Sequence, residues 1–308
     1  MNRLRTVSAA AAAVVAMSGV VSPVATVASA SGEPGELCVE EHAGETASAR
    51  VAGGSSAPDH REVSEAEAAA IEARTQQLAK QKGAPTDDVV IPTYVHVMAS
   101  STGEGDVSDK QIRDQIAVLN RTYGGGESTE AADTRYSFAL AGTDRYYVDQ
   151  WHVDRQSHVY RSQTRLGGAD ALNIWLVDFA YLGIATFPWD YEKQPSVDGV
   201  RVHWDSLPGG SINNYNLGET ATHEVGHWLG LYHVFQGGCR GDGDEVQDTP
   251  AQSAATLGCP EGQDSCTTQA GLDSIHNYMD YSYDSCYNQF TPGQSDRMDT
   301  FWAAYRSA

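Results

Sequence analysis

The chain has 308 residues, of which 41% are apolar and 20% are charged, so it can bury the core of one large domain or two modest ones. Disorder throughout the chain is excluded. Its 41 acidic residues against 20 Lys and Arg residues give a formal net charge of −21, which repels phosphate backbones and anionic membrane surfaces, so nucleic acid is not an expected partner.

Residues 1–30 are typical of a signal peptide. Arg3 and Arg5 precede an Ala- and Val-rich apolar stretch from Val7 to Val21, and residues 28–30 (Ala-Ser-Ala) permit cleavage after Ala30. The apolar stretch is shorter than the roughly 20 residues that a membrane-spanning helix needs. We therefore expect a secreted, extracellular protein with no membrane anchor, in which disulfides can form.

Residues 31–88 are expected to form a pro-segment, partly disordered and containing one helix. Gly, Ser, Ala and Glu dominate residues 31–58 and give little that could pack. Ser64 and Glu67 have the spacing of a capping box, which predicts a helix that runs to Lys82 and is ended by Gly83. The helix has few large apolar residues, so a removable segment is favoured over a separate domain.

Residues 89–308 are expected to form the compact folded domain, which opens with a strand. The stretch from Val89 to Met98 is rich in β-branched residues, and Pro92 predicts that this strand lies at a sheet edge or at a bulge. A helix follows from the capping box of Ser108 and Gln111, with one apolar face that ends at Tyr123.

Further strands are predicted at residues 136–140, 172–179, 184–187 and 199–204. Asn216 and Glu219 have capping-box spacing and predict the start of another helix. The last helix is predicted from its cap at Thr291 to about Arg306. Without any internal repeat, these elements predict an α/β or α+β sheet domain.

The segment from His223 to His233 reads His-Glu-Val-Gly-His-Trp-Leu-Gly-Leu-Tyr-His. Residues four apart share one face of a helix, so His223 and His227 can direct two imidazole nitrogens at one ion. Gly230 can take a positive φ and end the helix, which lets His233 approach as a third ligand. Three neutral imidazoles leave a fourth position for water, as in catalytic zinc sites, and Glu224 can act on that water as general base. Nitrogen ligands without nearby thiolates favour zinc over other transition metals.

This eleven-residue pattern resembles the signature of the metzincin metalloproteases, which includes a downstream Met-turn, here at Met279. The stretches 277–281 and 286–291 are similar to the pappalysin family, especially its secreted bacterial and archaeal members, and the resemblance covers about residues 89–307. It implies a twisted mixed sheet with a backing helix and an active-site helix in an upper subdomain that ends near residue 233. A smaller, disulfide-tied lower subdomain, 234–308, then ends in the C-terminal helix.

The resemblance also implies roles for single residues. His223, His227 and His233 hold zinc, Glu224 is the base and Met279 lies under the metal. Tyr281 is implied to stabilise the reaction intermediate, with a place in the aromatic core as the alternative.

Four cysteines follow the zinc-binding segment, and the sequence alone allows three pairings among them. The resemblance implies that Cys239 pairs with Cys266 and Cys259 with Cys286. Cys38 is left over in the predicted pro-segment. Its thiolate is a candidate latency switch that occupies the open zinc position, and a free or intermolecular thiol is the competing interpretation.

The loop from Gly237 to Pro250 is rich in oxygen ligands, so it is either a calcium site or a solvated acidic loop. The resemblance implies calcium, with Asp248 and Thr249 as the preferred ligands. It also places Asp284 at the floor of the pocket that receives the side chain after the scissile bond. A carboxylate there selects Arg, or less well Lys; capping of a turn or a place in the calcium shell is the alternative.

Together these features predict a secreted zinc endopeptidase that acts on protein or peptide substrates. The alternative is a secreted zinc-binding module, or a non-peptidase zinc hydrolase, that uses the same site. The natural substrate, the processing site and the oligomeric state do not follow from the sequence.

Overall fold

The structure is a computed structural model that describes residues 63–307. The predicted signal peptide, residues 31–62 of the predicted pro-segment and Cys38 lie outside the described residues. None of the helices within 63–307 is both long enough and apolar enough to cross a membrane.

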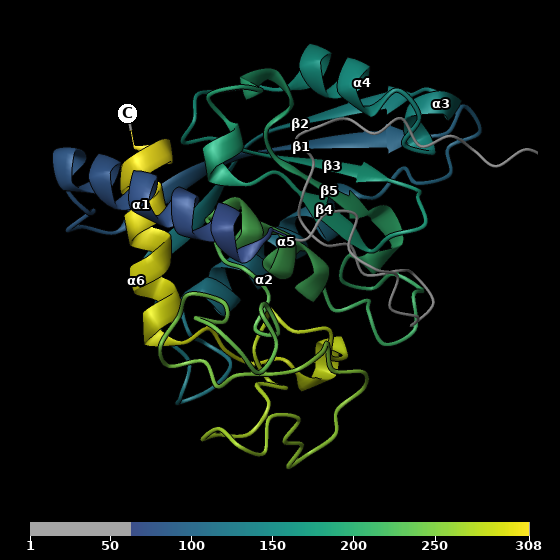
Figure 1. Cartoon of the computed structure of the whole chain (residues 1–308). Coiled ribbons are helices and arrows are strands. Elements are labelled where there is room, and N and C mark those ends of the chain that lie inside the picture. Colours follow the sequence, from purple (N-terminus) through teal and green to yellow (C-terminus); the bar gives the residue numbers. More distant parts are fainter. Residues whose placement is uncertain (1–62, 308) are drawn as a thin grey trace, which may run out of the picture. The chain divides into compact units, whose positions relative to one another are not determined.

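A five-stranded mixed sheet forms the centre of the described part, in the order β2-β1-β3-β5-β4 (Figure 1). Strands β1 to β3 and β5 pair in parallel, and the short β4 pairs antiparallel with β5. The strands span Val89–Ala99 (β1), Tyr136–Tyr147 (β2), Leu172–Val177 (β3), Gly183–Ala185 (β4) and Val200–His203 (β5). The mixed sheet with its helices confirms the predicted fold class.

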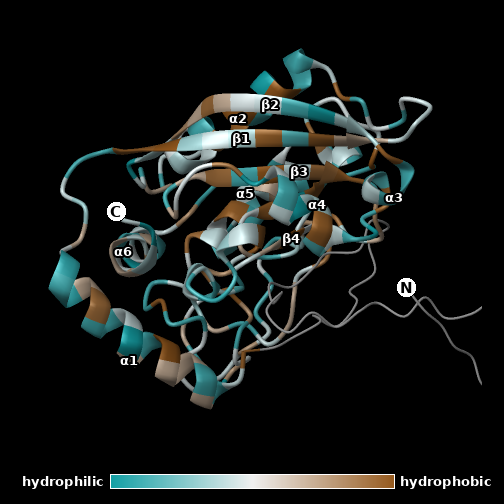
Figure 2. Cartoon of the chain, turned by 90° about the horizontal axis from the view of Figure 1, so that it is seen from above, coloured by the Kyte–Doolittle hydropathy of each residue, from teal (hydrophilic) through white to brown (hydrophobic). Residues whose placement is uncertain are grey.

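Strand β1 lies inside the sheet, so an edge position for Pro92 is wrong. The register with β2 shifts between Thr93 and Tyr94, which is the bulge that the sequence offered as the other possibility. Pairing with β3 begins only at Thr93, so the amide hydrogen that Pro92 lacks is not needed on that side. Strand β3 is buried along its whole length and is mostly apolar, whereas β2 becomes hydrophilic toward its carboxyl end in Figure 2.

Two helices, α2 (Asp109–Tyr123) and α5 (Glu219–Trp228), pack against each other below the sheet in Figure 1, and α4 (Ser157–Thr164) lies above it. The predicted capping box of α2 is present, since Ser108 Oγ accepts from the Gln111 amide at 3.2 Å. The predicted cap of α5 at Asn216 is wrong. Its N-cap is Gly218 in the left-handed conformation, with φ 96°, and its start is tied to α2 because Gln115 Nε2 donates to the Gly218 carbonyl at 2.9 Å.

The C-terminal helix α6 (Pro292–Phe301) starts at the predicted cap, Thr291, and continues as a π-helical turn, η5 (Trp302–Arg306). The helix predicted in the pro-segment is present as α1 (Glu65–Lys82) and packs against α6 and η5. Glu72 of α1 pairs with Arg297 at 2.7 Å, and the Thr75 and Tyr305 hydroxyls lie 3.0 Å apart. A pro-segment that ends at residue 88 stays a prediction. The helix in this region packs against the C-terminal helix of the sheet domain.

The remaining helical elements are single turns in the connections between the longer elements. They are α3 (Asp149–His152), η1 (Pro188–Asp190), η2 (Pro195–Val197), η3 (Trp204–Ser206) and η4 (Asp284–Cys286).

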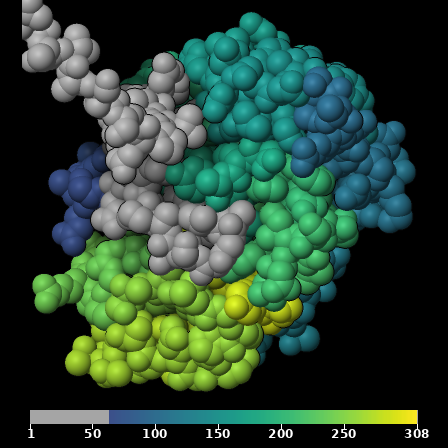
Figure 3. Space-filling view, turned by 90° about the vertical axis from the view of Figure 1, so that its right-hand side faces the viewer, coloured from purple at the N-terminus to yellow at the C-terminus, as the bar shows by residue number. Residues whose placement is uncertain are grey.

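The part of the chain after residue 233 consists mainly of turns before α6, and its surface lies below that of the sheet in Figure 3. Two disulfides join Cys239 to Cys266 and Cys259 to Cys286, the pairing that the family resemblance implies. With few regular hydrogen-bonded elements there, these cross-links restrict the unfolded chain and so stabilise this part.

A buried ion pair connects the C-terminus to the end of α5. Arg306 Nη1 and Nη2 donate to the two carboxylate oxygens of Asp198 at 2.8 and 3.0 Å, and both side chains are about 1% exposed or less. The guanidinium also stacks on the Trp228 ring, 3.7 Å from its centroid, while Trp228 Nε1 donates to Asp198 at 3.1 Å. The position of the last turn of α5 therefore depends on Asp198, which precedes β5, and on Arg306 in the C-terminal π-helical turn.

We expect Arg306→Met to lower the free energy of unfolding by about 3 kcal/mol, because it leaves the buried Asp198 carboxylate without its bidentate partner. The control is Arg74→Met, which removes an exposed pair with Glu192 and should cost less than about 1 kcal/mol. Urea unfolding curves of both variants measure the difference, and equal effects would contradict this role of Arg306.

Candidate metal centre

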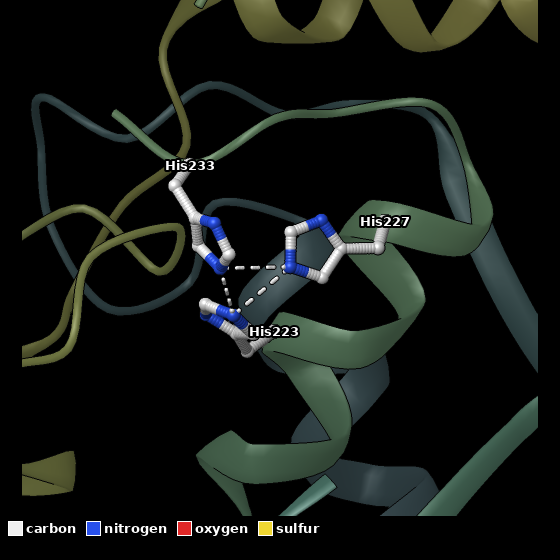
Figure 4. A group of neighbouring side chains, drawn as sticks. All are labelled: His223, His227 and His233. Carbon is white, nitrogen blue, oxygen red and sulfur yellow. Dashed lines mark hydrogen bonds between the residues drawn. The ribbon is translucent and has the colours of Figure 1, made fainter. Parts of the chain in front are cut away.

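Three imidazoles converge at the end of α5 (Figure 4). The Nε2 atoms of His223, His227 and His233 lie 3.1 to 3.2 Å from one another, and all three side chains are buried. Neighbouring ligand atoms in a tetrahedral zinc shell with bonds of about 2.0–2.1 Å lie about 3.3–3.4 Å apart. The three nitrogens therefore have close to the spacing that a single zinc ion requires.

The remaining ring nitrogens set the tautomers of two of these histidines. His223 Nδ1 lies 2.6 Å from the Tyr278 carbonyl oxygen, and His227 Nδ1 lies 2.8 Å from that of Leu231. A carbonyl oxygen only accepts, so each Nδ1 carries the hydrogen and each Nε2 turns its lone pair toward the common centre. This donor set is the one that a catalytic zinc ion takes, with three protein ligands and one position left for water.

The turn after α5 brings His233 to the other two. Gly230 has φ +106°, which only glycine adopts readily, and a Cβ at this position would lie 2.5 to 2.8 Å from atoms of Phe301. Arg297 of α6 donates through Nε to the Gly230 carbonyl at 2.9 Å. The C-terminal helix therefore supports the turn that orients the third imidazole.

Glu224 lies on α5 directly after His223 and is fully buried. Its carboxylate packs on Gly183, the first residue of β4, so closely that a Cβ there would overlap the Glu224 side chain. Nothing in the sequence around Gly183 marks it as a site residue. A glycine at the start of a strand is a weak signal of close backbone approach, and only the fold shows what approaches it.

Met279 and Tyr281 come from the segment after Asn277, which packs against α5. Met279 is fully buried, and its sulfur occupies the space where Gly226 of α5 lacks a side chain. The Tyr281 ring stands edge-on to His233, with centroids 5.0 Å apart, and lies 5.8 Å from the His223 ring. The structure therefore brings both predicted residues to the imidazoles, and Tyr281 borders two of them.

An acidic pocket of about 900 Å³ opens beside the first turn of α5 and includes Asp284 in its lining. The Asp284 carboxylate is buried and accepts from the Leu217 amide at 2.9 Å. Glu219, one turn before His223, also lines the pocket, and burial together with Glu127 and Asp284 raises its pKa well above the usual range. The pocket carries one guanidinium, Arg121, and the following carboxylates: Asp114, Glu127, Glu219, Glu261 and Asp284.

The two predicted calcium ligands lie in different hydrogen-bonded groups. Asp248 accepts from the Thr291 hydroxyl and the Gly293 amide at 2.7 and 2.8 Å, which places it at the amino end of α6. The Thr249 hydroxyl lies 2.7 and 2.9 Å from the carboxylate oxygens of Asp244, whose pKa burial raises to about 7. Cys38, the predicted latency switch, lies outside the described residues.

Known metalloproteases resemble this chain in sequence, and the similarity includes the three histidines. A family model for Peptidase_M43, described as pregnancy-associated plasma protein-A, matches residues 183–303, which contain all three histidines. An extracellular metalloprotease of Neurospora crassa is 43% identical over 248 residues, 76% of this chain and 84% of the relative. One from Verticillium alfalfae is 47% identical over 249 residues, 78% and 84% of the two chains.

Solved structures show the same fold. A Tannerella forsythia promirolysin mutant is 31% identical and superposes with a TM-score of 0.65, covering 77% of this chain and 88% of its own. Mature mirolysin from the same organism, in complex with a cleaved peptide, is 33% identical with a TM-score of 0.60 and covers 70% and 91%.

We expect Gly230→Ala to weaken zinc binding and to lower the free energy of unfolding by about 2–4 kcal/mol, because the new methyl group meets both an unfavourable φ and the Phe301 ring. Gly262→Ala is the matched control, since Gly262 has φ +75° but nothing within 4 Å of the added Cβ. It should cost only about 1 kcal/mol and leave zinc affinity unchanged. Competition with a chromophoric chelator measures the affinity, and equal loss in both variants would contradict the role of Phe301.

Proposed function

The chain belongs to the pappalysin family of metalloendopeptidases, and on that premise we propose that it is a secreted zinc-dependent endopeptidase in which Glu224 activates the attacking water. The observation that carries the proposal is the convergence of the His223, His227 and His233 nitrogens, with Glu224 buried on the same helix. The relatives in Neurospora crassa and Verticillium alfalfae are named extracellular metalloproteases, which supports secretion.

The three histidines would hold the zinc ion, which supplies Lewis-acid polarisation of the scissile carbonyl when bound. Glu224 removes the proton from the attacking water and returns it to the leaving amine. Gly183 keeps the carboxylate in place, because the Glu224 side chain fills the space above that glycine. Tyr281 borders His223 and His233, and its hydroxyl donates a hydrogen bond to the substrate oxygen as negative charge develops there.

We also propose that the acidic pocket receives the side chain after the scissile bond and prefers Arg, then Lys. Support comes from the excess of carboxylates over cations in its lining and from Arg121, which already pairs with Glu127 at 2.6 Å. A guanidinium from the substrate makes charge-assisted hydrogen bonds with such a site.

For calcium, we propose a site in the loop from Gly237 to Pro250, with Asp248 and Thr249 among its ligands. The buried Asp244 carboxylate beside Thr249 supports it, because its pKa of about 7 shows that burial makes its charge unfavourable, and a cation relieves that cost. A latency role for Cys38 stays a prediction.

We expect Glu224→Gln to lower kcat for peptide cleavage by at least about 100-fold, because the amide keeps the shape of the side chain but cannot take the proton. Zinc content should remain that of the parent. Release of fragments from denatured casein, with and without chelator, measures activity, and substantial activity in the variant would contradict the assignment of the base. Casein left intact by a zinc-loaded parent would favour a zinc-binding module or a non-peptidase hydrolase.

Gly183→Ala tests the role of the Glu224 carboxylate in a second way. The added methyl group displaces Glu224 without altering any ionisable group, so kcat should fall while zinc stays bound. Gly168→Ala is the control, because its added Cβ meets only the end of the Asp170 side chain on the surface. Equal activity of the two variants would argue against positioning by Gly183.

Asp284→Asn is expected to reduce the share of fragments that begin with Arg or Lys, since it removes one charge from the pocket while an amide oxygen can still accept from Leu217. Sequencing of the fragments from a mixed peptide library measures this share. Asp264→Asn, an exposed position outside the pocket lining, serves as control. A parent whose fragments begin with Leu or Phe would refute the assignment of the pocket.

Calcium is expected to raise the melting temperature of the parent, and Asp248→Asn should reduce that rise because it removes a charged ligand. Thermal unfolding in calcium, compared with magnesium at the same concentration, measures the effect. A melting temperature that is the same in both salts would exclude the site.

A further inference from the structure

A second group of metal-binding side chains lies at the carboxyl end of the sheet, where α3 sits beside the arrowheads of β1 and β3 in Figure 1. Ligand atoms of Glu104, His152 and Asp178 lie within 4.8 Å of one another. Glu104 is in the loop after β1, His152 ends α3, and Asp178 comes directly after β3. None of these residues takes part in the metal centre on α5.

His152 contributes the buried nitrogen atom of this group. Its Nδ1 lies 2.9 Å from the Met98 carbonyl oxygen, which only accepts, so Nδ1 carries the hydrogen. In the neutral ring Nε2 therefore presents a lone pair, and this nitrogen is buried with no hydrogen-bond partner among residues 63–307. It faces Asp178 Oδ2 at 3.6 Å. The carboxylate repels that lone pair at this distance, so the contact needs either a proton on Nε2 or a metal ion between the two groups.

The neighbours of Asp178 hold its carboxylate in this position. His203, the last residue of β5, accepts from the Asp205 amide through Nδ1 at 3.2 Å, so its hydrogen is on Nε2. That nitrogen lies 3.3 Å from Asp178 Oδ1, and such a donor orients a metal-binding carboxylate. The Asp178 amide also donates to the His152 carbonyl at 2.6 Å, which fixes the two residues relative to each other.

Gly105 lets the Glu104 loop close over the imidazole. A Cβ at Gly105 would lie 2.8 Å from His152 Cε1 and 3.0 Å from Nδ1, so any side chain there would push the loop away from the ring. The Glu104 carboxylate adds a second negative charge to the group. One buried nitrogen from the end of α3 and two carboxylates, one after β1 and one after β3, thus lie close to one another.

We propose that Glu104, His152 and Asp178 bind a second zinc ion, with His203 as the residue that orients Asp178. The imidazole favours a transition metal over calcium or magnesium, and zinc binds such sites more tightly than manganese or iron(II). The two carboxylates balance the charge of the ion. The bound ion joins the loop after β1 to α3 and to the segment from Asp178 to Leu182, which leads into β4.

Zinc stoichiometry tests this proposal on the full chain. Equilibrium dialysis against buffered Zn²⁺, followed by elemental mass spectrometry, is expected to find two zinc ions in the parent and one in Asp178→Asn. The asparagine keeps the shape, can accept from His203 and can donate to His152. The variant should therefore unfold in chelator at a temperature no lower than the parent does, and it should retain peptide cleavage.

His158→Ala is the matched control, because it removes an exposed histidine on the neighbouring helix α4 and should leave two zinc ions bound. Anomalous diffraction at the zinc edge is expected to place the second ion between His152 Nε2 and Asp178. A parent that saturates at one zinc, or an Asp178→Asn variant that retains two, would overturn the proposal. The zinc ion of the proposed catalytic centre is held by other residues. A parent that binds two zinc ions but cleaves no peptide would therefore contradict the proposed function and not the second zinc site.

Discussion

Three imidazole nitrogens held within 3.2 Å of one another inside the protein are the constraint on which the rest of the structure depends. A single helix brings only two of them together, since residues four apart stack on one face. The third requires the chain to reverse within a few residues, and Gly230 makes this possible at φ +106°. Phe301 and Arg297 of the C-terminal helix pack against that reversal, so the centre is held by residues about 70 positions away.

Buried polar groups also hold α5 and the three imidazoles in place. Asp198, Arg306 and Trp228 form a closed set of hydrogen bonds at the end of α5, and the carbonyls of Tyr278 and Leu231 set the tautomers of two histidines. A buried ion pair adds little net stability compared with apolar packing. What such pairs provide here is a defined position for the helix that carries His223, His227 and Glu224.

The sheet connects the two metal-binding groups. Its carboxyl end carries Glu104, His152 and Asp178, and the chain that follows Asp178 becomes β4, whose Gly183 packs on Glu224. An ion at the carboxyl end would therefore hold the start of the segment that leads to Gly183. The proposed catalytic centre and the proposed second zinc site share no residue, so each can be tested without altering the other.

Sequence alone determined those features whose physical signal is local. The spacing of His223, His227 and His233, the caps at Ser108 and Thr291, and the apolar runs of the strands all act within a few residues. Tertiary structure decided the rest. Strand β2 continues to Tyr147 through polar residues because β1 pairs with it, and α5 starts at Gly218 because Gln115 of α2 binds there. Pro92 sits inside the sheet because its neighbour pairs only from Thr93 onward. Glu104, His152 and Asp178 have no local pattern, because loops from separate strands meet only when the sheet assembles.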